Sequence, residues 1–278
     1  MQYQSHTPTL RLAPFIERFW LCSDAPPHRR ERILPSGTIE LVINLRDDEI
    51  RIDDPAQPGG CRRYSGAVLS GTYSAPFVID PVQHASILGV HFRPGGAFPF
   101  LGLPAGELAD AHVDLETVWG ARIATELRER LCAAVRPSER FSLIEETLLS
   151  RLRDPPVRHG AVREALHLFE QAGTDVRVRE VARHVGLSQK RFIQVFAAEV
   201  GLKPKLYSRI RRFQRARALV PKSASPDWAR TAVDCGYFDQ SHLIRDFLAF
   251  ASLSPSDYLR QRSERVLPNH LPHAGSNE

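Results

Sequence analysis

Two stretches of the sequence place hydrogen-bonding side chains between apolar anchors at helical spacing. They are residues 186–196, GLSQKRFIQVF, and residues 236–247, GYFDQSHLIRDF. Each contains a glycine and, two or three positions later, a polar residue. Apolar residues then occur four and eight positions after that polar residue and would lie on one face of a helix. The remaining polar side chains would share the opposite, free face. Amide, ammonium and guanidinium groups can hydrogen-bond to the edges of DNA bases. The two stretches are therefore candidates for nucleic-acid recognition.

Each stretch is preceded by a short amphipathic segment, so the complete unit is a helix, a turn and a second helix. In the first unit, VREVARHVGLS, Gly186 suits the positive φ of a sharp turn, and Ser188 can cap the next helix. Gly236 and Asp239 occupy the same positions in the second unit. One such unit is a common helical hairpin, but two copies about 50 residues apart predict a double helix-turn-helix domain.

A third helix is predicted between the two units, over residues 203–220, with Pro204 suited to its first turn. Tyr207, Ile210 and Phe213 form its apolar stripe. Arginines crowd the rest of its surface: Arg209, Arg211, Arg212, Arg215 and Arg217. Further on, Ser254 and Asp257 have the spacing of a capping box and predict a last short helix.

The first 100 residues have the alternating pattern of strands, at 38–45 and 85–92, separated by Pro/Gly turns. Two amphipathic helices are predicted at 121–131 and 141–152; they could form a dimer interface or cap the strands. The predicted fold class is α+β with two domains: a β-rich N-terminal domain, either a cupin-like barrel or a sandwich, and an all-α C-terminal domain. We expect a domain for ligand sensing or dimerisation at 1–152 (helical at about 114–152), a linker at 153–159, the double helix-turn-helix domain at 160–262 and a flexible tail at 263–278.

Composition and charge agree with a globular protein that has a polyanionic partner. Of the 278 residues, 42% are hydrophobic and 25% charged, and no apolar run is long enough to cross a membrane. Residues 157–278 carry 20 Lys and Arg against 12 Asp and Glu, whereas the preceding residues are slightly acidic. No secretory signal pattern is present, so we expect a cytoplasmic location. The four cysteines are too scattered for a zinc site or a redox pair.

Residues from about 160 to 262 resemble the double helix-turn-helix DNA-binding domain of AraC-type transcriptional regulators. The resemblance covers this domain from end to end, and the residues that carry it are VREVARHVGLSQKRFIQVFAAEVGLKPKLYSRIRRFQRARALV and AVDCGYFDQSHLIRDFLAFASLSPSDYLR. ILPSGTIELVINL and GVHFRPGGAFPFLGLP are similar to the cupin-like N-terminal domain of some members. The resemblance implies that recognition helices at about 188–199 and 239–250 enter successive major grooves, which lie about 34 Å apart.

The resemblance also implies which side chains face the bases. Gln194 suits an adenine edge, and Lys190 and Arg245 suit a guanine edge. The expected base-reading residues are Gln189, Lys190, Gln194, Gln240, His242 and Arg245. Phosphate contacts, which set affinity and salt dependence but not sequence preference, are expected from Arg191, Arg209 and Arg211.

The sequence departs from the family pattern at several positions. Members often carry a Lys where Ala197 and Leu248 stand, and a Gly commonly ends the second recognition helix where Ser252 stands. Gln194 and Leu243 replace the Arg and Phe that are frequent there. These differences bear on the DNA affinity of the second unit more than on its fold.

An alternative from another class is a cupin-like metal-dependent enzyme, or a small-molecule-binding protein, with an accessory helical domain. Glu40, His84 and His91 are available as ligands, but the His-x-His pair usual in cupin sites is absent from the sequence. A third hypothesis is that the two helix-turn-helix units bind another protein instead of DNA. We predict a regulator that is not an enzyme and has no cofactor, catalytic site or metal site. Its expected partners are double-stranded DNA, a small-molecule effector, RNA polymerase and a second copy of the chain. The regulator could act as an activator or as a repressor of transcription.

Overall fold

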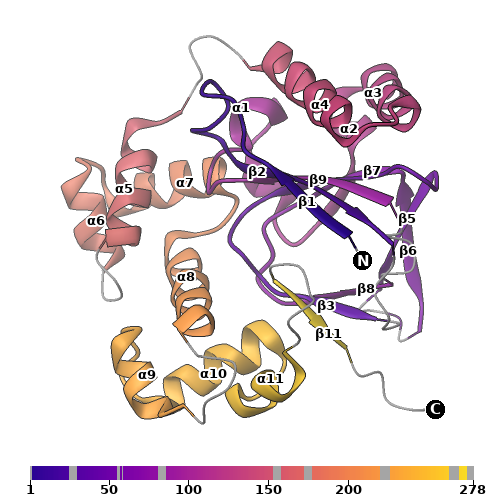
Figure 1. The fold of residues 1–278 in the computed structure, drawn as a ribbon. Coiled ribbons are helices and arrows are strands. Elements are labelled where there is room, and N and C mark those ends of the chain that lie inside the picture. The colour runs from indigo at the N-terminus through magenta and orange to yellow at the C-terminus, as the bar shows by residue number, and fades with distance from the viewer. Residues whose placement is uncertain are drawn as a thin grey trace.

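The chain folds into a β-rich N-terminal part and an all-helical C-terminal part that lie side by side (Figure 1). The computed structural model describes residues 2–24, 30–54, 57, 59–80, 86–152, 158–171, 177–219, 226–262 and 269–273. The predicted α+β fold class is confirmed. A β-rich domain with a helical extension precedes a double helix-turn-helix domain.

Two antiparallel sheets face each other in the N-terminal part. Among the described residues, the first sheet has the strand order β1-β2-β9-β4-β7-β10 and the second has β11-β3-β8-β5-β6. The strands of the first are β1 Gln2–His6, β2 Ile16–Ser23, β9 Ser86–Phe92, β4 Glu40–Asn44, β7 Ala67–Ser70 and β10 His112–Asp114. The strands of the second are β11 His270–Pro272, β3 Glu31–Ile33, β8 Phe77–Ile79, β5 Glu49–Asp53 and β6 Cys61–Ser65. The two strands predicted from the sequence correspond to β4 and β9. These strands pair with each other, and Leu41 lies opposite Val90.

Helices cover the face of the first sheet that points away from the second sheet. They are α1 Phe98–Leu101, the 3-10 helix η2 Ala105–Leu108, α2 Leu115–Trp119, α3 Ala121–Ala133 and α4 Pro137–Arg151. Leu127 of α3 and Ile144 of α4 share one core with Leu41 and Val90 of the sheet. The apolar stripes of the two predicted helices are thus buried within the domain, where they cap the sheet, rather than left for a dimer interface.

The C-terminal part has a single core to which both helix-turn-helix units contribute. Its helices are α5 Gly160–Gln171, α6 Val178–His184, α7 Gln189–Val200, α8 Pro204–Leu219, α9 Trp228–Asp234, α10 Gln240–Ala251 and α11 Pro255–Gln261. We call α6 with α7 the first unit and α9 with α10 the second unit. Phe192 and Phe196 of α7, Phe213 of α8 and Phe247 of α10 are fully buried in this core.

The predicted turns and caps are present in both units. Gly186 and Gly236 have φ values of 73° and 74°, a conformation that costs glycine little. The side chain of Ser188 accepts a hydrogen bond from the backbone N–H of Arg191, and Asp239 accepts one from the N–H of His242. Each recognition helix therefore begins at the residue that the sequence predicts, because a polar cap satisfies free N–H groups of its first turn.

The predicted flexible tail is wrong for residues 269–273. The strand β11 (His270–Pro272) pairs with β3 at the edge of the second sheet, with Leu271 opposite Arg32 (Figure 1). Leu271 is buried, and Nδ1 of His270 lies 2.5 Å from Oε2 of the buried Glu31. A short segment without helical periodicity can thus be ordered by an open sheet edge, which supplies its backbone hydrogen bonds. The rest of the predicted tail, 263–268 and 274–278, lies outside the described residues.

The two parts contact each other beyond β11. Gln214 of α8 donates a hydrogen bond of 2.6 Å to the backbone oxygen of Pro35, and η2 packs against α7. Arg158, at the end of the predicted linker, pairs with Glu199 of α7 at 2.8 Å. Residues 153–157 of that linker lie outside the described part, so the division of the chain at 153–159 remains a prediction.

Cys22, Cys61, Cys132 and Cys235 are free thiols. Within the described residues, no helix combines the length and the apolar character needed to cross a bilayer.

Candidate nucleic-acid interface

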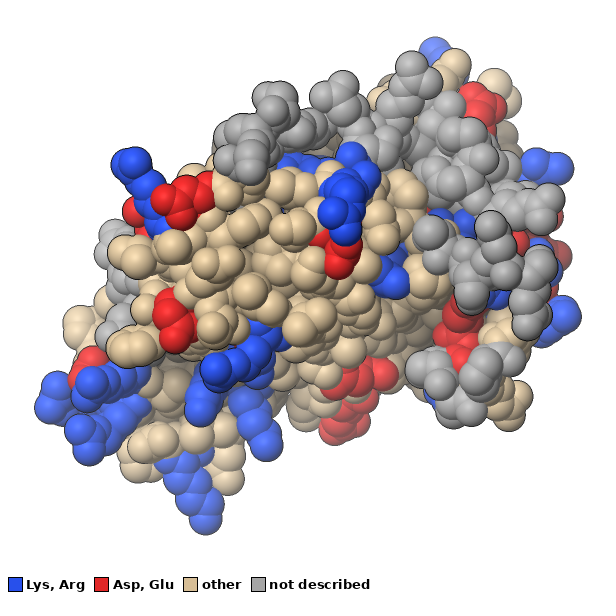
Figure 2. Space-filling view, turned by 90° about the horizontal axis from the view of Figure 1, so that it is seen from below, with Lys and Arg blue, Asp and Glu red and all other residues tan. Residues whose placement is uncertain are grey.

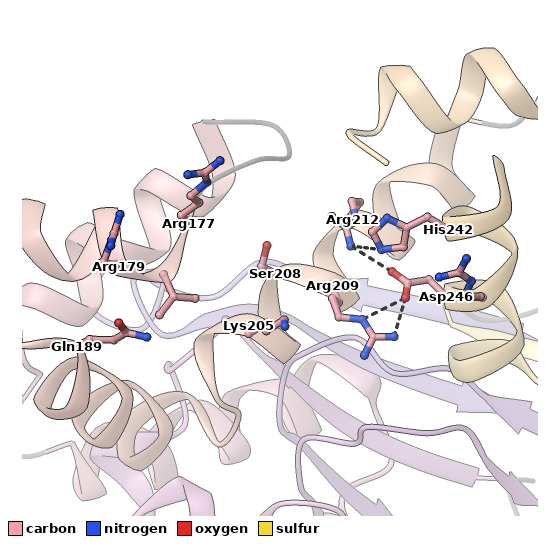
Figure 3. Close-up of a pocket in the computed structure, with 11 residues that line it drawn as sticks. Arg177, Arg179, Gln189, Lys205, Ser208, Arg209, Arg212, His242 and Asp246 are labelled. Atoms are coloured by element: carbon pink, nitrogen blue, oxygen red, sulfur yellow. Dashed lines mark hydrogen bonds and ion pairs between the residues drawn. The ribbon is translucent and has the colours of Figure 1, made fainter. Parts of the chain in front are cut away.

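A cleft of about 640 Å³ separates the first unit from the second, and α8 lies between them (Figure 3). Its lining side chains come from both units and from α8: Arg177, Val178, Arg179, Gln189, Lys205, Ser208, Arg209, Arg212, His242, Arg245 and Asp246. The N-terminal end of each recognition helix, α7 and α10, contributes to this lining through Gln189 and His242. The cleft therefore joins the two predicted recognition surfaces.

The cleft is strongly cationic. Six of its eleven lining side chains are Lys or Arg, and Asp246 is the only acid among them. Figure 2 shows blue Lys and Arg side chains gathered at the left of the view, the side on which Figure 1 places the helices of the C-terminal part. A concave surface lined by one sign of charge concentrates a polyanion.

The predicted base-reading residues lie on the free faces of the two recognition helices. Gln189, Lys190 and Gln194 are exposed on α7, and Gln240 and Arg245 are exposed on α10. His242 is half-buried. Of the six, Gln189, His242 and Arg245 also line the cleft, whereas Lys190, Gln194 and Gln240 are not among its lining residues.

The predicted phosphate contacts lie in different surroundings. Arg191 is exposed at the start of α7, and Arg211 is half-buried on α8 outside the cleft lining. Arg209 lines the cleft but is already engaged: its Nη2 donates to Oδ1 of Asp246 at 2.6 Å, and its Nε donates to the same oxygen at 3.1 Å. A phosphate contact by Arg209 stays a prediction; in the structure its guanidinium also supplies the partner that the buried carboxylate of Asp246 requires.

Asp246 is the centre of a network that fastens α10 to α8. The side chain of Asp246 is 1% exposed, and its second oxygen lies 3.5 Å from Nη2 of Arg212. Arg212 is stacked on the ring of Tyr237, with the guanidinium carbon 4.5 Å from the ring centroid. Two arginines of α8 thus fix the orientation of the second recognition helix through one acid.

His242 joins the same network. Nη2 of Arg212 lies 3.2 Å from Nε2 of His242, and the ring of Tyr237 packs edge-on against the imidazole. Burial, followed by the charge of Arg212, lowers the pKa of His242. The imidazole is therefore neutral near pH 7, and Nε2 accepts the hydrogen bond from Arg212.

Sequence reasoning missed six of the polar lining residues: Arg177, Arg179, Lys205, Ser208, Arg212 and Asp246. Lys205, Ser208 and Arg212 follow one another at three and four positions, so a helix projects them from one face. That spacing was visible in the sequence. Arg177 and Arg179 flank the start of α6 and carried no signal of their own, since only the tertiary arrangement brings them to the cleft.

The alternative metal site has two of its three residues near each other. Nδ1 of His91 lies 3.5 Å from Oε1 of Glu40, and Nε2 lies 3.7 Å from Glu17. Oε1 of Glu40 also accepts a hydrogen bond of 2.8 Å from the indole of Trp20. Across the described ranges, no group of three or more His, Cys, Asp or Glu side chains is arranged to hold a metal ion. His84 lies outside those ranges.

Comparisons with protein families divide the chain in the same way as the structure. Residues 181–261 match the family described as a helix-turn-helix domain, which spans both units. Residues 4–114 match a family described as a domain of unknown function, DUF6597.

A curated relative and several solved structures are similar to the chain. An uncharacterized HTH-type transcriptional regulator of Haemophilus influenzae is 26% identical over 122 residues, which are 44% of this chain and 39% of that protein. The chain thus spans about two fifths of that relative's length. A transcriptional regulator of the AraC type from Chromobacterium violaceum has a TM-score of 0.34 at 23% identity, over 38% of this chain and 95% of that chain.

ToxT from Vibrio cholerae strain SCE256, in a structure with bound unsaturated fatty acid, has a TM-score of 0.46 at 11% identity, over 87% of this chain and 94% of that chain. The C-terminal part of this chain matches a helix-turn-helix domain family and folds into two helix-turn-helix units, and it follows a part that matches a family described as a domain of unknown function.

Proposed function

We propose that this protein is a sequence-specific DNA-binding transcriptional regulator that uses α7 and α10 as its two recognition helices. The observation that carries the proposal is the cationic cleft between two capped helices whose exposed faces bear Gln, Lys and Arg. Two such helices on one chain can read two turns of the major groove, which are about 34 Å apart.

The side chains divide into two roles in this proposal. Gln189, Lys190 and Gln194 of α7, with Gln240, His242 and Arg245 of α10, read base edges. Arg191 and Arg211, together with Arg177, Arg179 and Lys205 of the cleft, contact phosphates. Arg209 and Arg212 act differently, because their pairing with Asp246 positions α10 against α8. Each phosphate neutralised by such a cation makes binding more sensitive to salt.

The N-terminal domain is proposed to adjust DNA binding in response to a small molecule. Its contacts with α7 and α8, through η2 and the backbone oxygen of Pro35, support this role because they reach the DNA-binding part directly. The same domain is the proposed site of self-association, and RNA polymerase is a proposed partner. We propose a cytoplasmic location and no catalytic activity.

The test is binding to the DNA upstream of the protein's own gene, measured by fluorescence anisotropy across a salt series with random-sequence competitor. We expect tight, competitor-resistant binding whose affinity falls steeply as salt rises. Arg245→Ala should lose about 1–3 kcal/mol of discrimination between this fragment and the competitor. Replacing Arg177 and Arg179 together by Ala should instead weaken binding to both DNAs and reduce the salt slope by about 2.

Arg122→Ala is the matched control, because Arg122 is an exposed arginine of α3 that lies outside the cleft lining. It should leave affinity, discrimination and salt slope at their wild-type values. Equal binding to every sequence, unaffected by Arg245→Ala, would reject sequence-specific reading. Binding that hardly responds to salt would favour a protein-binding role for the helix-turn-helix units.

A further inference from the structure

The two helix-turn-helix units differ by one residue in the turn that precedes the recognition helix. The cap Ser188 follows Gly186 by two positions, whereas the cap Asp239 follows Gly236 by three. Both glycines have the same left-handed conformation, so the two turns begin alike. The additional residue of the second turn is Phe238, which lies directly before the cap of α10.

The side chain of Phe238 lies in solvent. It is 91% exposed, and the only other exposed aromatic side chain among the described residues is Tyr3, at 38%. An apolar residue directly before a helix cap often packs against the fourth residue of that helix, here the fully buried Leu243. Phe238 is too exposed to pack in this way. Single apolar side chains are common on protein surfaces, so the position of Phe238 decides what it can do.

The residues on both sides of Phe238 are held in place. Tyr237 is buried, with the guanidinium carbon of Arg212 4.5 Å from its ring centroid. On the other side, Oδ1 of Asp239 accepts a hydrogen bond of 2.7 Å from the backbone N–H of His242. The backbone therefore presents the Phe238 ring from a fixed position. An aromatic side chain presented in this way loses little conformational entropy when it makes a contact.

This position belongs to the surface that would face DNA. In helix-turn-helix complexes, the N-terminal residues of the recognition helix contact base edges in the major groove. Phe238, Gln240 and Ser241 at this end of α10 are all exposed. A phenyl ring forms no conventional hydrogen bond with a base edge. The apolar group that the major groove offers is the 5-methyl group of thymine.

The charge around Phe238 favours DNA over a protein as the group that covers it. His242 and Arg245 of the same helix line the cationic cleft, in which Lys and Arg make up six of the eleven lining residues. A protein that covered the Phe238 ring would also approach these cations, whereas a DNA duplex brings phosphates to them.

From this placement we infer that Phe238 recognises a thymine, through apolar contact with its 5-methyl group, in the half-site that α10 reads. The inference deepens the proposed function, on which it rests, because it adds a specificity-determining residue that acts without a hydrogen bond. The turn of the first unit has no additional residue, so the methyl contact is expected in one half-site and not in the other.

The test replaces thymine by uracil, which removes the methyl group and leaves every hydrogen-bonding group of the base in place. A site is first selected from a randomised library with the wild-type full chain, and Arg245→Ala identifies the half-site that α10 reads. Each thymine of that half-site is then changed to uracil in turn, and affinity is measured by fluorescence anisotropy. One of these changes should weaken wild-type binding about fourfold, because one buried methyl group contributes about that much.

Phe238→Ala should bind the thymine site about five- to tenfold more weakly than wild type, because the ring no longer buries apolar surface against the base. It should also bind the thymine and uracil versions of that position equally well. Phe238→Leu keeps an apolar side chain and should still prefer thymine to uracil.

Leu10→Ala is the matched control, because Leu10 is a 93% exposed apolar residue of the N-terminal part. It should keep both the affinity and the preference for thymine of the wild type. The melting temperatures of Phe238→Ala and Phe238→Leu should equal that of the wild type, since the ring is exposed and adds little to the core. A loss of DNA affinity in Phe238→Ala then reports on the contact with DNA and not on folding.

The inference is overturned if no thymine-to-uracil change in the α10 half-site weakens wild-type binding, or if Phe238→Ala still distinguishes the two bases. It is also overturned if Phe238→Ala binds the selected site as tightly as wild type does, a result that would assign the ring to a protein partner. Failure of the proposed function is distinguishable, because selection with the wild-type protein would then enrich no sequence.

Discussion

The two helix-turn-helix units share one design, but different parts of the molecule support them. Each recognition helix carries a buried acid, Glu199 near the C-terminal end of α7 and Asp246 in the middle of α10, and each acid is paired with arginine. In the first unit the arginine is Arg158, at the entrance to the DNA-binding domain. In the second unit the arginines come from α8 within that domain.

The two recognition helices also differ in what packs against their C-terminal ends. The C-terminal end of α7 packs against η2 of the N-terminal domain, and a Cβ atom at Gly201 would come 2.5 Å from the hydroxyl of Thr72. At the equivalent end of α10, Ser252 is exposed. The first unit is therefore positioned partly by the N-terminal domain and the second by α8. The N-terminal domain thus contacts the first unit directly through η2, whereas it reaches the second unit by way of α8.

The largest expected effect comes from removing the acid of the second unit. Asp246→Ala leaves Arg212 and Arg209 without their shared partner and should lower the free energy of unfolding by about 3–5 kcal/mol. Urea denaturation provides the measurement. Asp234→Ala removes an exposed acid of α9 and should cost at most about 1 kcal/mol. Equal losses in the two variants would show that the buried network does not support α10.

The corresponding change in the first unit should be smaller. Arg158→Ala removes a charged hydrogen bond to Glu199, but the backbone N–H of His159 still donates to that acid at 2.9 Å. The expected loss is about 1.5–3 kcal/mol of unfolding free energy. Calorimetric scans should show it, with Arg163→Ala on the exposed face of α5 as the control. A loss greater than that of Asp246→Ala would reverse the comparison.

DNA recognition allows the two units to be separated directly. Gln194→Ala should relax base preference in one half of the operator and Arg245→Ala in the other half, each by about 1–3 kcal/mol. Selection of binding sites from a randomised library measures both halves at once. If both variants lost base preference at the same base pairs, the two helices would not lie in successive grooves. Thr147→Ala, a change on α4 away from both units, serves as the control.

The smallest effect concerns the residues that end the two helices. Ser252 has φ 53° and Gly201 has φ 90°, and a positive φ costs a residue with a side chain about 1–2 kcal/mol. Ser252→Gly should therefore stabilise the protein by about 1 kcal/mol. Gly201→Ser should destabilise it, because the new side chain also meets Thr72. Melting temperatures that move in the same direction for both variants would contradict this account.

Local signals in the sequence identified most of the C-terminal domain. The caps Ser188 and Asp239 and the turn glycines Gly186 and Gly236 act through hydrogen bonds and dihedral angles of adjacent residues. Such features need no knowledge of distant parts of the chain, so the bounds of α7 and α10 follow from the sequence almost to the residue. The alternation in β4 and β9 similarly indicated their buried faces, although not their pairing partners.

Contacts between distant residues escaped sequence reasoning. Nothing local marks Arg209 as the partner of Asp246, 37 positions away, and an arginine on an amphipathic helix is otherwise a reasonable phosphate contact. The order of His270 likewise depends on the open edge of β3, about 240 residues earlier.

The sequence by itself thus determined the helices, their caps, the repeated unit and the basic character of the C-terminal part, because these follow from periodicity, neighbouring hydrogen bonds and composition. The tertiary structure alone decided which cations face the cleft and which are bound to a buried acid. It also decided that β11 pairs with the edge strand β3 of the second sheet and that the imidazole of His112 is buried. Burial changes the free energy of a polar group, and only the folded chain determines which groups are buried together.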